Sequence, residues 1–415
     1  MSISKKFKNI VRRALRYTPT YRKEWKREFG DNPQALVEEA VRRAIRDVPY
    51  YEGYSRYMDG GFTLSRFPII RKRDILSHSR ELVSRKAFKP LLKRKETGGS
   101  TGMSLELFYS PSTILRKEVI RDYAFSLIGN NLRIASMRGD VPEGGALVGS
   151  AGGGGILLSS YLLSAATLDN YLDALRAHRT ECLHVYPSAI GIMARLIIQK
   201  YGTAPNLPHL KGILGSSEIF SREEKQIVAR AFPGVKIVDF YSHNELACAA
   251  IAVDDGPFEF YTGFGYVEFM PTGEEVNGNR VAEIVATSVM NRTMPFIRYG
   301  TDDYVELDAD GVPVAVIGRT SDYIFTKSGE RLPCMVNTRN ISFVNVVNFQ
   351  YHQPEKGKLI MRIVPNDRFT EADRGYILED MRNSYHGRLD CDVELVSDVE
   401  RTPAGKQRRL VQDVK

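Results

Sequence analysis

The chain has 415 residues, 43% of them hydrophobic and 26% charged, which is the composition of a soluble globular protein too long for one ordinary core. Its four cysteines lie far apart and form no Cys-x-x-Cys pair, so we expect neither a zinc ribbon nor a disulfide framework, but a reducing cytoplasm. The net charge of +8 is modest, no apolar h-region follows the basic N-terminus, and no run is apolar enough to span a membrane. We therefore expect a cytoplasmic protein of two or more domains.

Residues 4–49 are predicted to form basic helices, because apolar positions recur at partial helical spacing among many Lys and Arg residues. A solvated face on a packed helix is one interpretation. Contact of residues 4–29 with a membrane surface or an acidic partner is the other. No nucleic-acid reader motif accompanies the charge, so no nucleic-acid partner is expected.

After a turn and a short helix within residues 67–75, a loop of glycine and hydroxyl residues follows a basic run. The loop reads Thr97-Gly98-Gly99-Ser100-Thr101-Gly102 and leads into residues 105–109, which alternate like a half-buried strand. Between two strands, such a loop can bind a phosphate through backbone N–H groups and hydroxyls. It can equally be a hairpin turn. A Walker loop is excluded, because Gly102 is followed by Met103 and a strand.

Helices and strands then alternate along the chain. Helices are expected at 111–128, 168–177, 189–200 and 221–232, and strands at 156–163, 183–186, 210–214 and 235–240. A Gly-rich loop precedes the first of these strands, and Ser221 with Glu224 three residues later forms a capping box. This succession predicts a parallel sheet with helices on its faces.

From residue 261 onward the pattern changes twice. Short strands at 265–270, 278–288 and 304–307 suggest a β subdomain, and a β-β-α-β pattern over residues 345–396 suggests a separate small α+β domain. The expected fold class is α/β. A large multi-subdomain N-terminal domain, residues 1–319, contains the parallel sheet and the β subdomain, and residues 320–415 form the small C-terminal domain.

Five motifs stand in a fixed order, and they are the glycine loop and residues 241–245, 298–303, 318–322 and 403–406. In this order and spacing the sequence resembles the adenylate-forming superfamily of acyl- and aryl-CoA ligases, peptide-synthetase adenylation domains and luciferases, and within it the phenylacetate–CoA ligase-like branch. The resemblance covers nearly the whole chain. It implies an ATP- and Mg²⁺-dependent ligase that converts a small-molecule carboxylic acid to an acyl-adenylate and passes the acyl group to a thiol, with coenzyme A as the first choice.

Other outcomes stay open. The acceptor can be the phosphopantetheine of an acyl carrier protein, for which the basic N-terminal helices are suited, or an amine. A protein of another class, a degenerate nucleotide-binding protein without catalysis, would also retain some of these motifs. The departures from the family pattern favour this alternative, whereas the joint presence of Glu245, Asp303, Arg319 and Lys406 argues against it.

The resemblance gives the first motifs defined roles. The loop from Thr97 to Gly102 would hold the departing phosphates, although residues 103–105 lack the Lys that the family often has there. Tyr241 would stack on adenine, and Glu245 would bind Mg²⁺ as a catalytic carboxylate. Asn244 stands where the family usually has Thr near the α-phosphate, and Ser242 replaces the usual Gly.

The later motifs complete the expected nucleotide site. Asp303 would accept the ribose hydroxyls. Asp302, in the usual Gly position before it, is either a solvated neighbour or an alternative acceptor. Arg319 would contact ribose or phosphate, and Asp322, or a neighbouring residue, would be the hinge that makes the small domain mobile. Lys406, a compact charge on a long stem, would be the catalytic cation that bridges the substrate carboxylate and the α-phosphate.

Ser217 and Glu218 belong to the nucleotide site that the resemblance implies. The acyl pocket would lie among residues 186–188, the strand end at Gly215 and the loop after Tyr241. Ser216, Ser217 and His243 make this region polar, which favours an aryl, hydroxy or amino acid over a fatty acid. His243 either contacts substrate or has a structural role. The sequence does not identify the acid.

Overall fold

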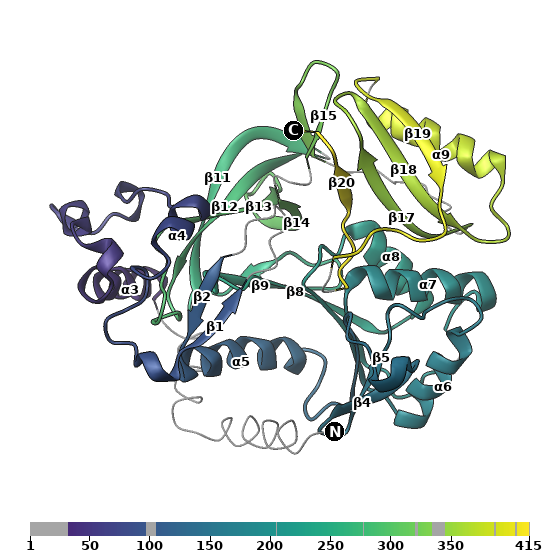
Figure 1. Ribbon diagram of the computed structural model, residues 1–415, viewed down its shortest axis with the longest axis horizontal. Coiled ribbons are helices and arrows are strands. Elements are labelled where there is room, and N and C mark those ends of the chain that lie inside the picture. Colours follow the sequence, from purple (N-terminus) through teal and green to yellow (C-terminus); the bar gives the residue numbers. More distant parts are fainter. Residues whose placement is uncertain are drawn as a thin grey trace. The chain divides into compact units, whose positions relative to one another are not determined.

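The computed structural model describes residues 32–96, 105–204, 206–276, 278–319, 323–333, 345–385, 387–402 and 405–414 (Figure 1). The chain divides into two compact units, each built from two segments of sequence. Unit 1 comprises Met1–Asn130 and Val238–Gly318, and unit 2 comprises Asn131–Ile237 and Arg319–Lys415. The predicted domain division, residues 1–319 and 320–415, stays a prediction.

The first segment of unit 2 forms a mostly parallel sheet in the order β7-β6-β3-β5-β4. Its strands are β3 (Ile134–Met137), β4 (Val148–Gly152), β5 (Gly155–Leu158), β6 (Cys182–Val185) and β7 (Gly212–Ser216). Strands β7, β6, β3 and β5 run parallel, and β4 is antiparallel to β5. The predicted parallel sheet is confirmed, although β3 was not among the predicted strands.

Strand β4 lies in the Gly-rich stretch that is predicted to be a loop, so that prediction is wrong for residues 148–152. Val148, Gly149 and Ser150 pair with the strand β5. The turn between β4 and β5 contains glycines at 152–154, all with positive φ. The glycines thus correctly indicated the turn, but they also made the strand before it look like part of a loop.

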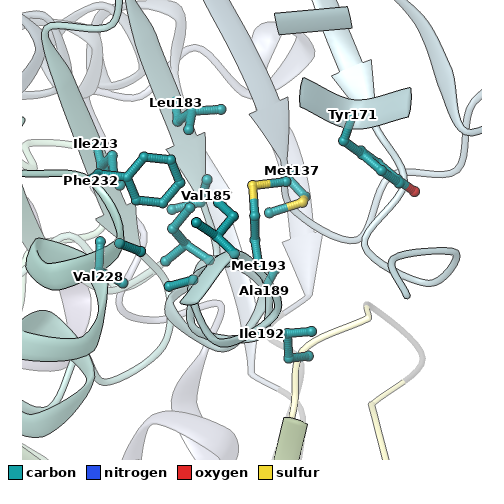
Figure 2. Packing of buried hydrophobic residues seen from close by; sticks show 14 of the residues in the cluster. Met137, Tyr171, Leu183, Val185, Ala189, Ile192, Met193, Ile213, Val228 and Phe232 are labelled. Carbon is teal, nitrogen blue, oxygen red and sulfur yellow. The ribbon is translucent and has the colours of Figure 1, made fainter. Parts of the chain in front are cut away.

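Three helices cover this sheet, and they are α6 (Leu168–His178), α7 (Pro187–Tyr201) and α8 (Arg222–Ala231). Helix α7 is buried over most of its length because it is apolar on nearly every face. Figure 2 shows Leu183, Val185 and Ile213 of the strands packed with Met193 of α7 and Phe232 after α8. This core fixes the strand ends from which the candidate site residues extend.

The predicted capping box at helix α8 is only half present. The Ser221 hydroxyl accepts the N–H of Glu224 at 3.2 Å, as expected. The Glu224 carboxylate instead lies 3.5 Å from the guanidinium of Arg195, whose side chain is 4% exposed. A buried ion pair between α7 and α8 therefore takes the carboxylate that the capping box would use.

The second segment of unit 2 contains a four-stranded sheet, β19-β18-β17-β20, with helix α9 packed against it (Figure 1). The elements are β15 (Tyr323–Phe325), β16 (Arg331–Pro333), β17 (Val346–Gln353), β18 (Lys358–Pro365), α9 (Glu371–Ser384), β19 (Asp390–Leu395) and β20 (Leu410–Gln412). The predicted β-β-α-β order is present, and β20 adds a strand parallel to β17 that the sequence pattern did not show.

Unit 1 combines helices with antiparallel sheets. Its helices are α3 (Pro33–Asp47), α4 (Lys72–His78) and α5 (Pro111–Ser126), with short 3-10 helices at Pro49–Tyr51, Tyr54–Met58, Leu64–Arg66 and Lys89–Leu91. A further 3-10 helix, Glu143–Gly145, lies in unit 2. The strands of unit 1 are β1 (Lys93–Glu96), β2 (Glu106–Tyr109), β9 (Ala249–Val253), β10 (Glu259–Phe260), β11 (Gly265–Val276), β12 (Asn279–Ser288), β13 (Tyr299–Leu307) and β14 (Pro313–Arg319). Strand β8 (Lys236–Ser242) enters from unit 2.

Candidate site residues lie on or next to several of these sheets, and Tyr241 lies on β8, which pairs antiparallel with β9. Strands β1 and β2 pair antiparallel on either side of the glycine loop, which itself lies outside the described residues. Strands β11, β12, β13 and β14 form the predicted β subdomain in that order. The predicted α/β fold class, a large domain with a parallel sheet and smaller sheets, is confirmed. Across the described ranges, no helix is both long enough and apolar enough to cross a membrane.

Buried hydrogen bonds fix the segment that leads into β13. The Tyr51 hydroxyl donates to the Pro295 carbonyl at 3.0 Å and accepts the N–H of Ile297 at 3.0 Å. Arg298, in the left-handed region with φ of 48°, donates to the Phe67 carbonyl at 2.6 Å. Arg298 therefore joins the first residue of the predicted ribose motif to the segment around Phe67.

Candidate active site

Tyr241 and Asp303, predicted for adenine and ribose, lie together in unit 1. The Tyr241 hydroxyl donates to Asp303 Oδ2 at 2.8 Å, although the residues are 62 positions apart. The Asp303 N–H donates to the Thr301 hydroxyl, which in turn donates to the Ile284 carbonyl. Asp303 is only 6% exposed, so its position on β13 is well defined. An aromatic ring and an oriented carboxylate thus stand side by side.

Asn244 contacts both strands that flank the glycine loop, because its backbone carbonyl contacts β2 and its side chain contacts β1. The Tyr109 hydroxyl donates to the Asn244 carbonyl, and Lys95 Nζ donates to Asn244 Oδ1 at 2.5 Å. Lys95 lies on β1, two residues before the glycine loop. Residues 103–105 after the loop include no Lys, but the ammonium of Lys95, on the strand before the loop, lies next to Asn244, a predicted phosphate contact.

Glu245 belongs to a buried cluster with His243 and Cys248. His243 Nδ1 lies 3.1 Å from Glu245 Oε2, and its Nε2 lies 3.4 Å from Cys248 Sγ. Burial opposes a charge on the imidazole, but Cys248 and Glu245 outweigh burial and raise the pKa of His243 to about 10. His243 therefore fits the structural interpretation better than substrate contact, since it fixes the Glu245 carboxylate.

A magnesium ion would find one suitable protein ligand here. Glu245 offers the oxygen chemistry that Mg²⁺ prefers, and Mg²⁺ commonly takes one or two carboxylates and completes its shell with phosphates and water. Within the described parts of the chain, no group of three or more His, Cys, Asp or Glu side chains could hold a metal. Glu245 therefore fits a Mg²⁺ bound together with a nucleotide rather than in a cage of protein ligands.

Two departures from the family pattern have simple backbone explanations. Asp302, in the usual Gly position, has φ of 60°, a left-handed conformation that Gly adopts freely and Asp tolerates. Its carboxylate lies 3.7 Å from Arg71 Nη1. Ser242 has no positive φ and continues β8 in regular pairing with Ala249. Neither substitution demands a backbone path that glycine alone could follow.

In unit 2, Ser217 and Glu218 follow β7 at the carboxyl end of the parallel sheet. Ser217 has φ of 75°, and its hydroxyl accepts a hydrogen bond from Arg138 Nη2 at 2.7 Å. The Arg138 guanidinium also lies over the Tyr186 ring, 5.4 Å from its centre. Ligands of open α/β folds bind outside the carboxyl ends of the strands. Arg138 is therefore a candidate binding residue that the sequence analysis did not identify.

Both carboxylate oxygens of Glu218 accept backbone N–H groups. Oε2 accepts from Ser188 at 3.0 Å and Oε1 accepts from Gln407 at 2.9 Å. Burial raises the pKa of the Glu218 carboxyl, although these hydrogen bonds and the charge of Lys406 lower it in part. The bond to Gln407 connects the strand end of β7 to the predicted lysine loop.

Lys406 ends a tight turn that its own backbone closes. The Thr402 N–H donates to the Lys406 carbonyl at 2.8 Å, and the Lys406 N–H donates to the Thr402 hydroxyl at 3.2 Å. Gly405, with φ of 75°, donates to the Thr402 carbonyl at 2.8 Å. These hydrogen bonds join Gly405 and Lys406 to Thr402, so Lys406 does not stand on an unattached tail.

The structure thus brings the predicted residues together in two groups. Unit 1 contains Tyr241, Asn244, Glu245 and Asp303, and unit 2 contains Ser217, Glu218 and Lys406. Arg319 ends β14, and nothing is described of its side chain. The residues Thr97 to Gly102 and Asp322 lie outside the described ranges. Their assigned roles stay predictions.

Three residues that contact predicted site residues were not predicted from the sequence, and they are Lys95, Arg138 and Gln407. Arg138 had a usable signal, because it follows the short segment Ile134–Met137 as other candidate residues follow their strands. Lys95 and Gln407 had none beyond proximity to a motif, since their partners Asn244 and Glu218 lie 149 and 189 positions away.

No protein-family model matches the chain. Protein CapK of Staphylococcus aureus is 22% identical over 376 residues, which cover 85% of this chain and 81% of that protein. A 2-hydroxyisobutyryl-CoA ligase in the postadenylation state, in complex with R3-HIB-AMP, superimposes with a TM-score of 0.65 at 15% identity and covers 92% of this chain and 89% of its own. Anthranilate CoA ligase AuaEII in complex with anthranoyl-AMP gives 0.51 at 17% identity, covering 76% and 65%. The chain has the fold of the adenylate-forming acyl-CoA ligases.

Proposed function

We propose that the protein is an AMP-forming acid ligase, which activates a carboxylic acid with ATP and transfers the acyl group to a thiol, coenzyme A in the first instance. The contact between Tyr241 and Asp303 carries the proposal. Two separate motifs resemble those that bind the base and the ribose of one nucleotide, and Tyr241 and Asp303 belong to them. The 2.8 Å hydrogen bond between Tyr241 and Asp303 means that the ring and the carboxylate are close enough to contact the base and the ribose of a single nucleotide.

The chemistry of adenylation accounts for the other residue types. A substrate carboxylate attacks the α-phosphorus of ATP, and pyrophosphate leaves, so negative charge develops on phosphate oxygens. Lys406 would bridge the carboxylate and the α-phosphate, while Asn244 would lie near that phosphate. Mg²⁺, when bound through Glu245 and the phosphates, would offset part of their charge.

The remaining assigned residues would bind the nucleotide around this centre. The backbone N–H groups from Thr97 to Gly102 would contact the departing phosphates. Lys95, which already contacts Asn244, would provide a cation that the loop lacks. Arg319 would contact ribose or phosphate, and Ser217 would face the nucleotide from the end of β7.

Polar residues at the strand ends where the acyl pocket is expected favour an aryl, hydroxy or amino acid as substrate. At the carboxyl end of the parallel sheet, His184 Nε2 lies 3.2 Å from the hydroxyl of Ser216, which is buried. The two solved ligases carry the adenylates of a hydroxy acid and an aryl acid. Assignment to the phenylacetate–CoA ligase-like branch belongs to this proposal, as do a cytoplasmic location and transfer to a carrier protein or an amine as alternative second steps.

Acid-dependent exchange of radiolabelled pyrophosphate into ATP tests the first half-reaction. A library containing phenylacetate, substituted benzoates and small hydroxy acids should contain at least one acid that stimulates exchange. Coenzyme A added with that acid should then give a thioester. ATP binding without exchange for any acid would instead support a nucleotide-binding protein that does not catalyse adenylation.

A further inference from the structure

The Lys406 turn is attached to the parallel-sheet segment of its own unit by a buried carboxylate. Glu218 Oε1 accepts the backbone N–H of Gln407, the residue immediately after Lys406, at 2.9 Å. The other oxygen, Oε2, accepts the N–H of Ser188 in the first turn of α7 at 3.0 Å. One carboxylate therefore joins a helix start, a strand end and the lysine turn.

A second contact seats the same turn. A Cβ built on Gly405 would collide with the Tyr161 hydroxyl and would lie 2.8 Å from Gly139 Cα, so only glycine fits at this close approach. The Arg401 guanidinium lies over the Tyr161 ring, 5.5 Å from its centre. The turn is thus docked on both sides of Lys406.

Hydrogen bonds beyond the turn continue this attachment. Gln407 Nε2 donates to the Phe349 carbonyl of β17 at 2.6 Å, and Arg401 and Gln407 form an antiparallel bridge. The Arg195 guanidinium of α7 lies 5.6 Å from the centre of the Phe349 ring. Because Gln407 is held by its main chain and its side chain, the Lys406 Cα has little freedom while the bond to Glu218 is intact.

We propose that Glu218 is a positioning residue that seats the Lys406 turn for adenylation, acting through the backbone N–H of Gln407. This inference rests on the proposed function, and it gives Glu218 a role different from the nucleotide contact that the sequence suggested. Glu218 is suited to this role because a carboxylate accepts both N–H groups at once. A glutamine has a single acceptor oxygen and must turn its NH₂ toward one of the two donors.

Hydrogen–deuterium exchange of the peptide that contains residues 405–410 tests the seating without any assay of activity. In Glu218→Gln, the amide of Gln407 should exchange about tenfold to hundredfold faster, as expected when one hydrogen bond to a charged acceptor is lost. Glu223→Gln, an equal change of charge on the neighbouring helix α8, should leave that peptide unchanged. Unchanged exchange in Glu218→Gln would overturn the proposal, whether or not the protein is a ligase.

The catalytic consequence is tested by coupling to Lys406. Glu218→Gln should lower the turnover of acid-dependent pyrophosphate exchange by about tenfold or more, with a smaller change in the KM for ATP. Placed on Lys406→Ala, the same substitution should have no further effect, because Glu218 acts through Lys406. Additive losses, or a loss confined to the KM for ATP, would indicate a nucleotide contact and overturn the inference.

Gly405→Ala provides an independent perturbation. Its Cβ should displace the turn from Tyr161 and Gly139 and reproduce the faster amide exchange without altering Glu218. Full turnover in a Gly405→Ala variant whose turn is demonstrably loosened would show that seating does not matter for adenylation, and would overturn the proposal. If the unmodified protein shows no pyrophosphate exchange with any acid, the proposed function fails. The hydrogen–deuterium exchange of the Gln407 amide still shows whether Glu218 holds the Lys406 turn in place.

Discussion

Replacing Asp303 by Asn tests the ribose assignment with the least change in shape. The carboxylate has two acceptor oxygens, and Tyr241 donates to one of them, Oδ2. An asparagine has one acceptor oxygen and no charge, so one of the two hydroxyls must meet its NH₂ group and the hydrogen bond to a charged acceptor is lost. A hydrogen bond to a charged group contributes about 1.5–3 kcal/mol, and a site only 6% exposed offers little water as a substitute.

We therefore expect Asp303→Asn to weaken ATP binding by about tenfold to hundredfold, measured by isothermal titration calorimetry. Asp302→Asn is the matched control, because its side chain is 41% exposed and faces Arg71 at 3.7 Å, and it should change the affinity by less than about twofold. If Asp302→Asn weakens binding and Asp303→Asn does not, the ribose assignment moves to Asp302. If neither matters, this segment does not hold the ribose.

Two substitutions of Tyr241, measured by the same ATP-binding assay, distinguish stacking of its ring on adenine from the hydrogen bond by which its hydroxyl orients Asp303. Tyr241→Phe retains the ring and frees an oxygen of Asp303, so ATP affinity should fall by less than about fivefold. Tyr241→Ala removes the ring and should cost about 1–3 kcal/mol, the usual contribution of one base stacked on an aromatic side chain. Equal effects of the two substitutions would contradict a stacking role for this tyrosine.

Three further predictions concern charge. Lys406→Ala should slow pyrophosphate exchange by about 10²–10³-fold while a supplied acyl-adenylate is still converted to thioester; equal loss of both half-reactions would contradict a role confined to adenylation. Lys95→Ala should weaken ATP binding by about threefold to tenfold, less at high salt, whereas Lys93→Ala on the same strand should not; equal effects would indicate only the general field of this basic strand. Arg195→Met should lower the free energy of unfolding by about 3–5 kcal/mol in denaturation experiments, because the buried Glu224 loses its ion-pair partner on α7. Adding Glu224→Gln removes that buried charge and should restore most of the lost stability; a small loss in the single variant would show that the pair is unimportant.

The sequence predicted elements whose periodicity is local. Helices α5, α6, α7 and α8 are found where expected, and the half-buried alternation after the glycine loop forms β2. Strand β4 was missed because its glycines indicated a loop, and β3 and β20 were missed because nothing in their four and three residues was recognised as a strand pattern.

The candidate site was predictable as a set of residues but not as a set of contacts. Motif order indicated Tyr241, Glu245, Asp303 and Lys406, yet the partner of each depends on chain segments far away in sequence. The Glu218 carboxylate illustrates the difference. The resemblance implied a nucleotide contact for Glu218, whereas its oxygens accept N–H groups from 30 positions upstream and 189 positions downstream.

The departures from the family pattern bear directly on the choice between a ligase and a non-catalytic binding protein. Asp302 occupies a left-handed position that it can adopt, and Ser242 continues a regular strand, so neither distorts the backbone that carries Asp303 or Glu245. The absent loop lysine removes a cation, but Lys95 brings one to Asn244 from the preceding strand. The Glu218 carboxylate beneath the Lys406 turn accepts N–H groups at both oxygens, so it stabilises this turn whether or not the protein is a catalyst. The distinction therefore depends on whether that turn is needed for adenylation, which the coupling between Glu218 and Lys406 measures directly.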